Sequence, residues 1–320
     1  RPFGHSSSRL TWCRGPTSGR REPHDRRSAP SRLRRSPPPL PLAGDAHTSA
    51  PMEMPARLRR LIKRPPRVHV LRLYGAIGVP GRGPSLSDDG LAGSIEAAFK
   101  RYPAAVALAV NSPGGSPVQS ALIAARIRRL AAEKEVPVVA FCEDVAASGG
   151  YWLACAADEI FADPASILGS IGVIYAGFGF DQLIAKNGIE RRVHTAGESK
   201  TLLDPFQPEK PEDVERLKTI QEDIHRIFID EVKARRGDRL STEEELFDGS
   251  IRVGARAQAA GLIDGLAHLV PEMKTRFGEE VEFRDFGAKR SVLQRLGFAS
   301  LADDALAAAD ARLAWSRFGL

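Results

Sequence analysis

Short apolar runs alternate with apolar residues at helical spacing through the middle of the chain. Residues 68–73 alternate between apolar and polar positions as a strand does, and strand-sized apolar runs rich in valine and alanine cover residues 104–110 and 136–142. Runs of this length and composition are typical of buried strands. The first two of these three segments are each followed by a glycine-containing loop and then by a helical pattern, at residues 91–101 and 117–133. This repeat of strand, loop and helix predicts a parallel sheet with crossover helices, an α/β fold.

The rest of the chain is predicted to be mainly helical, with one further strand. The elements expected there are a helix at 178–186, a strand at 189–195, a helix at 212–236, smaller elements at 254–260 and 267–277, and a tail helix at 301–315. The helix at 212–236 has the clearest pattern. Acidic Glu212 and Asp213 lie in its first turn and Arg235 and Arg236 in its last, which favours a helix through its dipole.

Positive charge is concentrated at the beginning of the chain. Residues 1–50 hold ten Arg and no Lys against Glu22, Asp25 and Asp45, a net charge of +7, while the whole chain carries +6, so residues 51–320 carry −1. A nucleic-acid-binding domain shows its basic excess within the fold, so we expect no nucleic-acid partner.

The composition divides the chain into four regions. They are a disordered leader at 1–53, rich in Arg, Pro and Ser, a basic segment at 54–67, a folded domain at 68–287 and a partly helical tail at 288–320. The leader lacks the apolar residues needed for a core. Translation from a misassigned start, a transit-like segment and a basic tail all remain open explanations for it. The basic segment is either a solvated tail or a peripheral contact with an anionic membrane.

The three cysteines and the apolar content bound the chemistry and the location. Cys13, Cys142 and Cys155 lack the spacing of metal ligands or of a disulfide framework, so neither a metal nor another cofactor is expected, and a reducing compartment fits. No window reaches the ~18–20 apolar residues that a membrane span requires. We find no signal peptide or transmembrane helix in the sequence and expect a location in the cytoplasm or peripheral to a membrane.

The strongest chemical motif lies where the third strand meets a helix. Ser148 follows the apolar run at 136–142 and precedes Gly149, Gly150 and an alanine-rich helical stretch. A serine at such a turn can present its hydroxyl and the next backbone N–H to a substrate, as a nucleophile requires. The alternative is a tight turn with a capping serine.

A nucleophilic serine needs a base, and the histidines do not supply an obvious one. No histidine occurs between Ser148 and His194, and His69, His225 and His268 fall on a strand edge or in helical patterns without a paired acid, so a structural or solvated role is expected for them. Lysine is the remaining candidate, since a desolvated amine can accept the serine proton. Lys200 lies in a loop of small residues after the predicted strand at 189–195, although position alone leaves a solvated role open.

Four motifs in a fixed order carry a resemblance to a known family. They are Asn-Ser-Pro-Gly-Gly at 111–115, Ala-Ser-Gly-Gly-Tyr at 147–151, Gly-Ser-Ile-Gly-Val at 169–173 and Gly-Glu-Ser-Lys at 197–200. Their sequence resembles that of the signal peptide peptidase A (protease IV) family of serine peptidases, over residues 68–283 and in its short, single-repeat bacterial form. The resemblance implies a crotonase/Clp-protease-like α/β fold of repeated β-β-α units with C-terminal helical elements.

The resemblance also implies roles for individual residues. Ser148 falls on the family's nucleophile and Lys200 on its general base. Gly114 or Gly115, with Gly149, falls on the backbone donors of the oxyanion hole, which agrees with the unpaired N–H groups expected at helix starts. Ser170 falls on a serine that helps to hold the lysine.

We therefore expect a serine endopeptidase with a Ser-Lys dyad, acting on peptide or protein substrates that include signal peptides or membrane-associated peptides. The family further implies a homo-oligomer with active sites at subunit interfaces. Two alternatives stay open: a crotonase-like acyl-CoA hydratase or isomerase that uses Glu143 and Asp144, and an inactive scaffold that binds peptides.

Overall fold

The computed structural model describes residues 65–78, 86–197, 200–242 and 244–287, together with Trp315, Ser316 and Phe318. The predicted leader, most of the basic segment and residues 301–314 of the predicted tail helix lie outside these ranges. Within them, strands and helices alternate along the chain through its first half. This alternation confirms the predicted α/β class.

A single eight-stranded sheet organises the described residues, with the strand order β6-β5-β3-β2-β1-β8 and with β4 pairing with β3 and β7. Its strands are β1 (Arg67–Tyr74), β2 (Ala105–Ser112), β3 (Val138–Ala147), β4 (Glu159–Ala162), β5 (Ile167–Gly169), β6 (Ile251–Val253), β7 (Gly265–Leu266) and β8 (Glu282–Gly287). All pairs are parallel except β5 with β6. The carboxyl ends of β2, β3 and β5 therefore meet at one edge of the sheet, where functional residues of such folds gather.

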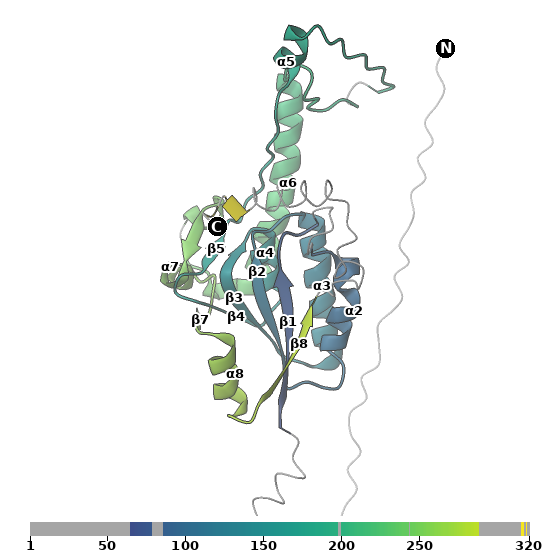
Figure 1. Ribbon diagram of the computed structural model, residues 1–320. Helices are drawn as coiled ribbons and strands as arrows, with labels where there is room; N and C mark the ends of the chain where they lie inside the picture. The colour runs from purple at the N-terminus through teal and green to yellow at the C-terminus, as the bar shows by residue number, and fades with distance from the viewer. Residues whose placement is uncertain are drawn as a thin grey trace, which may run out of the picture. The chain divides into compact units, whose positions relative to one another are not determined.

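Helices cover the two faces of the sheet unequally (Figure 1). The helices are α2 (Asp88–Ala98), α3 (Pro117–Lys134), α4 (Gly149–Ala154), α5 (Asp181–Lys186), α6 (Pro211–Arg236), α7 (Gly254–Ala259) and α8 (Leu269–Phe277). Helices α2, α3 and α4 pack on one face through a large apolar core. A smaller core, which includes Phe141 of β3 and Met273 of α8, lies on the other face. Alternate residues of the strands supply the two cores because successive side chains point to opposite faces.

Local signals set the ends of the helices that flank the sheet edge. Ser116 caps α3 by accepting a hydrogen bond from the Gln119 N–H at 3.4 Å, and Pro117 is the first helical residue. Helix α2 begins three residues earlier than the apolar pattern predicts, because Ser87 caps it through the Gly90 N–H. Ser, with Pro at the first helical position, is a strong start signal for a helix.

Helix α6 is anchored at its C-terminal half only. Phe228 stacks on Trp152 of α4 with ring centroids 4.7 Å apart, and the buried Arg236 guanidinium makes two bonds to the Asp264 carboxylate. In the other half, Ile220 stays 48% exposed. Figure 1 shows α5 and the adjoining loops at the end of α6 that is remote from the sheet. The helix was predicted correctly, but its apolar positions do not all pack against the core.

The predicted strand at 189–195 is wrong. These residues are exposed and form neither helix nor strand. No backbone hydrogen bond joins residues 190–195 to another part of the described chain. A strand exists only when a neighbour satisfies its N–H and C=O groups. The β-like sequence of this segment has no such neighbour in one protomer.

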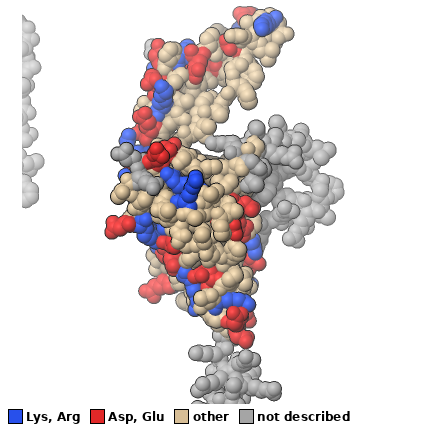
Figure 2. Space-filling model, turned by 90° about the vertical axis from the view of Figure 1, so that its left-hand side faces the viewer, with Lys and Arg blue, Asp and Glu red and all other residues tan. Residues whose placement is uncertain are grey.

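Charges of both signs are interspersed on the surface. On the face shown in Figure 2, blue and red side chains mix, and neither forms a continuous field. Among the helices that the structure describes, none combines the length and apolar content required to span a bilayer.

Candidate active site

Ser148 lies at the junction of β3 and α4 in a strained conformation. Its backbone angles are φ 52° and ψ −124°, in a region that costs a residue with a β-carbon about 1–3 kcal/mol. The surrounding hydrogen bonds hold it there: its N–H donates to the Gly169 carbonyl at 2.8 Å, and its own carbonyl accepts from the Tyr151 N–H at 2.9 Å. The side chain occupies the N-cap position of α4 but makes no capping hydrogen bond. The half-buried hydroxyl is therefore not used as a cap, unlike in the tight-turn alternative.

The backbone of the loop after β2 lies in close contact with Ser148. Gly114 has φ +99°, and a β-carbon there would lie 2.8 Å from both the Gly149 nitrogen and the Ser148 Cβ. A β-carbon on Gly115 would lie 2.1 Å from the Ile77 carbonyl oxygen. Only glycine permits both this approach and these backbone angles.

Ile77 orients the amides of this loop. Its N–H donates to the Gly114 carbonyl at 2.9 Å, and its carbonyl accepts from the Ser116 N–H at 2.8 Å. In a parallel bridge of this kind, the N–H of the residue between the two partners, Gly115, points away from Ile77. The Gly114 N–H is directed instead to the Ser112 hydroxyl at 3.2 Å. Sequence reasoning missed Ile77, because no local pattern links it to a loop nearly forty residues later.

Two backbone donors thus lie close together. The Gly149 N–H is at the first turn of α4, where helical N–H groups have no partner within the helix. A β-carbon on Gly149 would lie 3.4 Å from the Gly115 nitrogen. The backbone nitrogens of Gly115 and Gly149 therefore lie near each other and near Ser148.

Ser170 is brought beside Ser148 by the sheet. Ala147 of β3 pairs with Gly169 of β5, so the next residues, Ser148 and Ser170, leave the sheet side by side. Ser170 also has a positive φ, 50°, and its N–H donates to the Ser250 carbonyl at 2.8 Å.

Lys200 is not beside Ser148 within one protomer. It is an exposed turn residue, and the next residue, Thr201, lines a cavity together with Lys210, which precedes α6. The Ile171 carbonyl, close to Ser170, accepts a hydrogen bond from His225 of α6 at 2.9 Å. His225 lies 14 residues after the start of α6, which corresponds to about 21 Å along the helix axis. The structure therefore separates the predicted base from the predicted nucleophile.

His69 and His268 are engaged in contacts away from Ser148. His69 is buried and its Nδ1 bonds to the Ala98 carbonyl at 2.7 Å, and burial lowers its pKa below 6.5. The expectation that His268 has no paired acid is wrong, since its Nε2 lies 2.7 Å from an Asp163 carboxylate oxygen. These two residues are 105 positions apart, so the pairing was not visible in the sequence.

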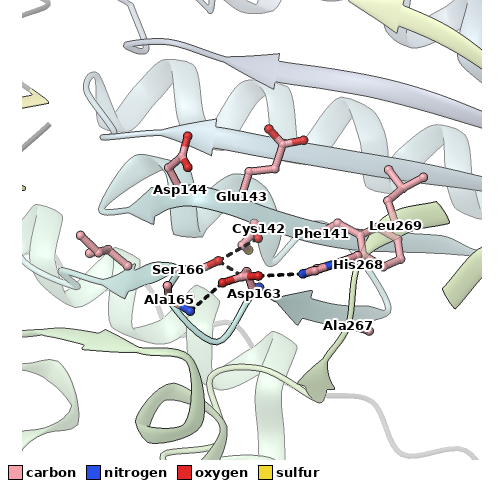
Figure 3. Close-up of a pocket in the computed structure, with 11 residues that line it drawn as sticks. Phe141, Cys142, Glu143, Asp144, Asp163, Ala165, Ser166, Ala267, His268 and Leu269 are labelled. Atoms are coloured by element: carbon pink, nitrogen blue, oxygen red, sulfur yellow. Dashed lines mark hydrogen bonds and ion pairs between the residues drawn. The ribbon is translucent and has the colours of Figure 1, made fainter. Parts of the chain in front are cut away.

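The His268–Asp163 pair lines a cavity of about 440 Å³ on the face of the sheet that carries α8 (Figure 3). Ser166 also lines it, but its buried hydroxyl donates to the Cys142 carbonyl and accepts from the Asp163 N–H, both at 3.0 Å. A serine bonded in this way is not prepared for attack. Ser166, His268 and Asp163 therefore do not form a second catalytic triad.

Glu143 and Asp144, the two carboxylates of the hydratase alternative, line the same cavity. Glu143 accepts a hydrogen bond from the Tyr74 hydroxyl at 2.6 Å, and Asp144 accepts one from the Asn111 amide at 2.7 Å. Asp144 precedes Ser148 by four residues of β3, or about 13 Å. In the part of the chain covered by the structure, no three or more His, Cys, Asp and Glu side chains are grouped so as to hold a metal ion.

A strained serine at a strand-to-helix turn, next to two backbone N–H donors, is the arrangement in which serine hydrolases present their nucleophile. Comparison with known proteins points to one family. Residues 131–281 match the family model for peptidase family S49. The resemblance read from the four motifs is thereby confirmed.

Individual relatives agree with this assignment. The chain is 36% identical over 171 residues to the chloroplastic serine protease SPPA of Arabidopsis thaliana, covering 53% of this chain and 25% of that one. It is 35% identical over 169 residues to a putative signal peptide peptidase SppA of Enterococcus faecium, covering 51% and 47%.

A match over more of this chain is to a protein that is not named as a protease. The chain is 46% identical over 296 residues to the Na(+)/H(+) antiporter NhaA of Brucella melitensis, covering 85% of this chain and 40% of that protein. The chain thus spans less than half the length of each of these three relatives. Among solved structures, a mutant of a membrane-bound stomatin-specific protease in complex with a substrate peptide aligns at TM-score 0.45 and 17% identity, covering 77% of this chain and 98% of that one.

Proposed function

We propose that this chain is a serine endopeptidase in which Ser148 is the nucleophile. The observation that carries the proposal is the strained backbone of Ser148, which holds an uncapped hydroxyl beside two unpaired backbone donors. A merely structural turn gains nothing from this strain, whereas a nucleophile must stand clear of its helix. The match of residues 131–281 to a peptidase family model supports the same conclusion.

The oxyanion hole is assigned to the N–H groups of Gly115 and Gly149. Of the two glycines that the sequence left open, Gly115 is favoured because the Gly114 N–H already points to the Ser112 hydroxyl. Each such donor typically lowers the activation barrier by about 3 kcal/mol, a hundredfold in rate. Gly114 then acts by shape, since any side chain there would press on Ser148.

The base is Lys200 of a neighbouring protomer. Within one protomer Lys200 is displaced by the length of half of α6, so a dyad requires a second copy. Exposed apolar surface supports such an assembly. Of the 17 exposed large hydrophobic side chains among the described residues, ten lie between residues 174 and 227. Exposed apolar surface concentrated in this way marks an interaction site.

The reaction follows from these positions. The neutral amine of Lys200 removes the Ser148 proton as the oxygen attacks the scissile carbonyl carbon, and the resulting oxyanion is held by the two backbone donors. The protonated lysine then gives its proton to the leaving amine, and the C–N bond breaks. Water hydrolyses the acyl-enzyme by the same route and regenerates the serine. Ser170, next to Ser148, is proposed to accept a hydrogen bond from the lysine amine.

The substrates are proposed to be peptides, including signal peptides or membrane-associated peptides. The name of the Enterococcus relative supports the first class. A position in the cytoplasm or on the membrane periphery is part of the same proposal.

Labelling with a serine-directed fluorophosphonate tests the nucleophile without knowledge of the substrate. We expect the full-length protein to be labelled at Ser148, and Ser148→Ala to show no labelling. Ser166→Ala serves as the matched control and retains labelling, since the Ser166 hydroxyl is already bonded on both sides. Labelling that persists in Ser148→Ala would contradict the assignment.

Mixing two inactive variants tests the shared dyad. Ser148→Ala and Lys200→Ala are each expected to lose at least about a hundredfold in kcat/KM, as members of one catalytic unit do. Co-refolded mixtures should regain activity where an intact Ser148 meets an intact Lys200. Mixtures that assemble together but stay inactive at every ratio would show that the dyad forms within one chain.

A further inference from the structure

Strand β6 lies at a lateral edge of the sheet, close to Ser148, and its outer side is unpaired among the described strands. Among the strands that the structure describes, β6 pairs with β5 alone. Hydrogen bonds from Ser170 N–H to the Ser250 carbonyl and from Gly254 N–H to the Ser166 carbonyl show which residues face β5. Because the direction of backbone groups alternates along a strand, the N–H and C=O groups of Ile251 and the N–H of Val253 point away from β5, whereas the Val253 carbonyl belongs to the N-cap of α7. Their side chains are 47% and 44% exposed.

The same chain contains a segment suited to this edge. Residues 189–195 have the sequence of a strand, yet the backbone groups of residues 190–195 have no backbone partner among the described residues; Ile189 alone donates its N–H, to the Ile184 carbonyl at 3.0 Å. Ile189 and Val193 are 59% and 37% exposed. The segment is also held in place, since Arg191 binds the Asp204 carboxylate at 2.9 Å and lies over the Phe206 ring at 4.8 Å.

We propose that residues 189–195 of a neighbouring copy of this chain add to β6 as a further strand of the sheet. The inference rests on the proposed function and deepens it, because it states how the neighbour's lysine reaches Ser148. The outward backbone groups of β6 lie close to Ser148, and those of residues 190–195 lie just before Lys200. In this arrangement the two sets form hydrogen bonds with each other.

The dimensions fit. Strands in a sheet are about 4.8 Å apart, so the added strand lies about 10 Å from β5, whose next residue is Ser170. Lys200 follows Thr195 by five residues, which reach at most about 17 Å when extended. Over this distance Lys200 of the neighbour can extend to the carboxyl ends of β5 and β3, where Ser148 lies. A segment of the same protomer cannot do so, because α6 holds it away from the sheet.

Cysteine cross-linking between two proteins tests the pairing directly. One protein carries Ile251→Cys, and each of seven others carries a single cysteine at one position from 189 to 195, with Cys13→Ser throughout and the buried Cys142 and Cys155 left in place. Co-refolded pairs should form a disulfide whose yield alternates along the segment, because side chains of a strand alternate between its faces. Val118→Cys, an exposed position on α3, replaces Ile251→Cys in the control and should form no such pattern. Absent cross-links, or equal yields at all seven positions, would overturn the proposal.

Proline at the open edge tests the backbone contact. Val253→Pro removes an outward N–H and requires φ to move from −105° to about −65°, a change that stays within the β region. We expect the cross-links to disappear and kcat/KM to fall at least about a hundredfold, because Lys200 of the neighbour is no longer placed beside Ser148. Val253→Ala keeps the N–H and should lose about fivefold or less. Equal losses in the two variants, at similar melting temperatures, would contradict strand addition.

The outcomes separate this inference from the proposed function. If the cysteine variants cross-link with the alternating pattern but fluorophosphonate does not label Ser148 of the wild-type protein, the pairing stands and the peptidase proposal fails. If Ser148 is active and no alternating cross-link forms, the pairing fails alone. A substrate peptide with one cysteine that cross-links to Ile251→Cys in place of the neighbour would also overturn it, by showing that the edge receives substrate.

Discussion

A single methyl group at Gly114 should separate catalysis from folding. In Gly114→Ala, the new β-carbon is placed 2.8 Å from the Gly149 nitrogen and 2.8 Å from the Ser148 Cβ. Carbon and nitrogen atoms in contact prefer about 3.5 Å, so the serine turn must move by roughly half an ångström or more. The positive φ of +99° adds about 1–3 kcal/mol of backbone strain.

The displacement falls on the groups that are proposed to react. Moving Gly149 away from the oxyanion position removes the effect of one donor, which lowers kcat by about 10²–10³-fold. We expect Gly114→Ala to lose fluorophosphonate labelling of Ser148 and peptide hydrolysis by this factor, while urea unfolding shows a domain that is destabilised but still folds cooperatively.

Gly93→Ala is the matched control. Gly93 lies inside α2, and a β-carbon there meets no atom within 4 Å. Alanine at this position should raise the free energy of unfolding by about 0.5–1 kcal/mol and leave labelling unchanged. Wild-type labelling in a folded Gly114→Ala protein would refute the assignment of the Gly114 loop to the active site.

Two further predictions concern stability. Burial lowers the pKa of His69 below 6.5, so the folded protein keeps this side chain neutral at a pH where the unfolded chain takes up a proton. The free energy of unfolding should therefore decrease as pH falls from about 6.5 towards the folded pKa, and it should decrease less in His69→Gln. Urea titrations near pH 5.5 and pH 7.5 measure this difference. Asp264→Ala leaves the buried Arg236 guanidinium without its carboxylate and should cost about 3–5 kcal/mol of unfolding free energy. The exposed ion pair of Arg226 provides the comparison, and Arg226→Ala should cost less than about 1 kcal/mol. Equal costs for these two substitutions would contradict the anchoring of α6 by Arg236.

Much of the sheet and its helices could be predicted from the sequence, because the signals are local. An alternating pattern marks β1, apolar runs mark β2 and the first half of β3, and Ser116 with Pro117 marks the start of α3. The turn at Ser148 was recognised from the glycines that follow it. In each case the responsible residues lie within a few positions of the feature, where spacing and backbone preference decide the outcome.

Only the tertiary structure decided the features that depend on distant residues. The predicted strand at 189–195 has no partner in one protomer, and strand sequence without a partner leaves backbone groups to water. The bridge to Ile77 and the Ser112 hydroxyl set the directions of the Gly115 and Gly114 N–H groups, and His268 meets Asp163 across 105 positions. Lys200 is displaced from Ser148 by the length of α6, which packs on α4 only through its C-terminal half. Residue types determined which groups are able to react, whereas long-range pairing and helix length determined which of them meet.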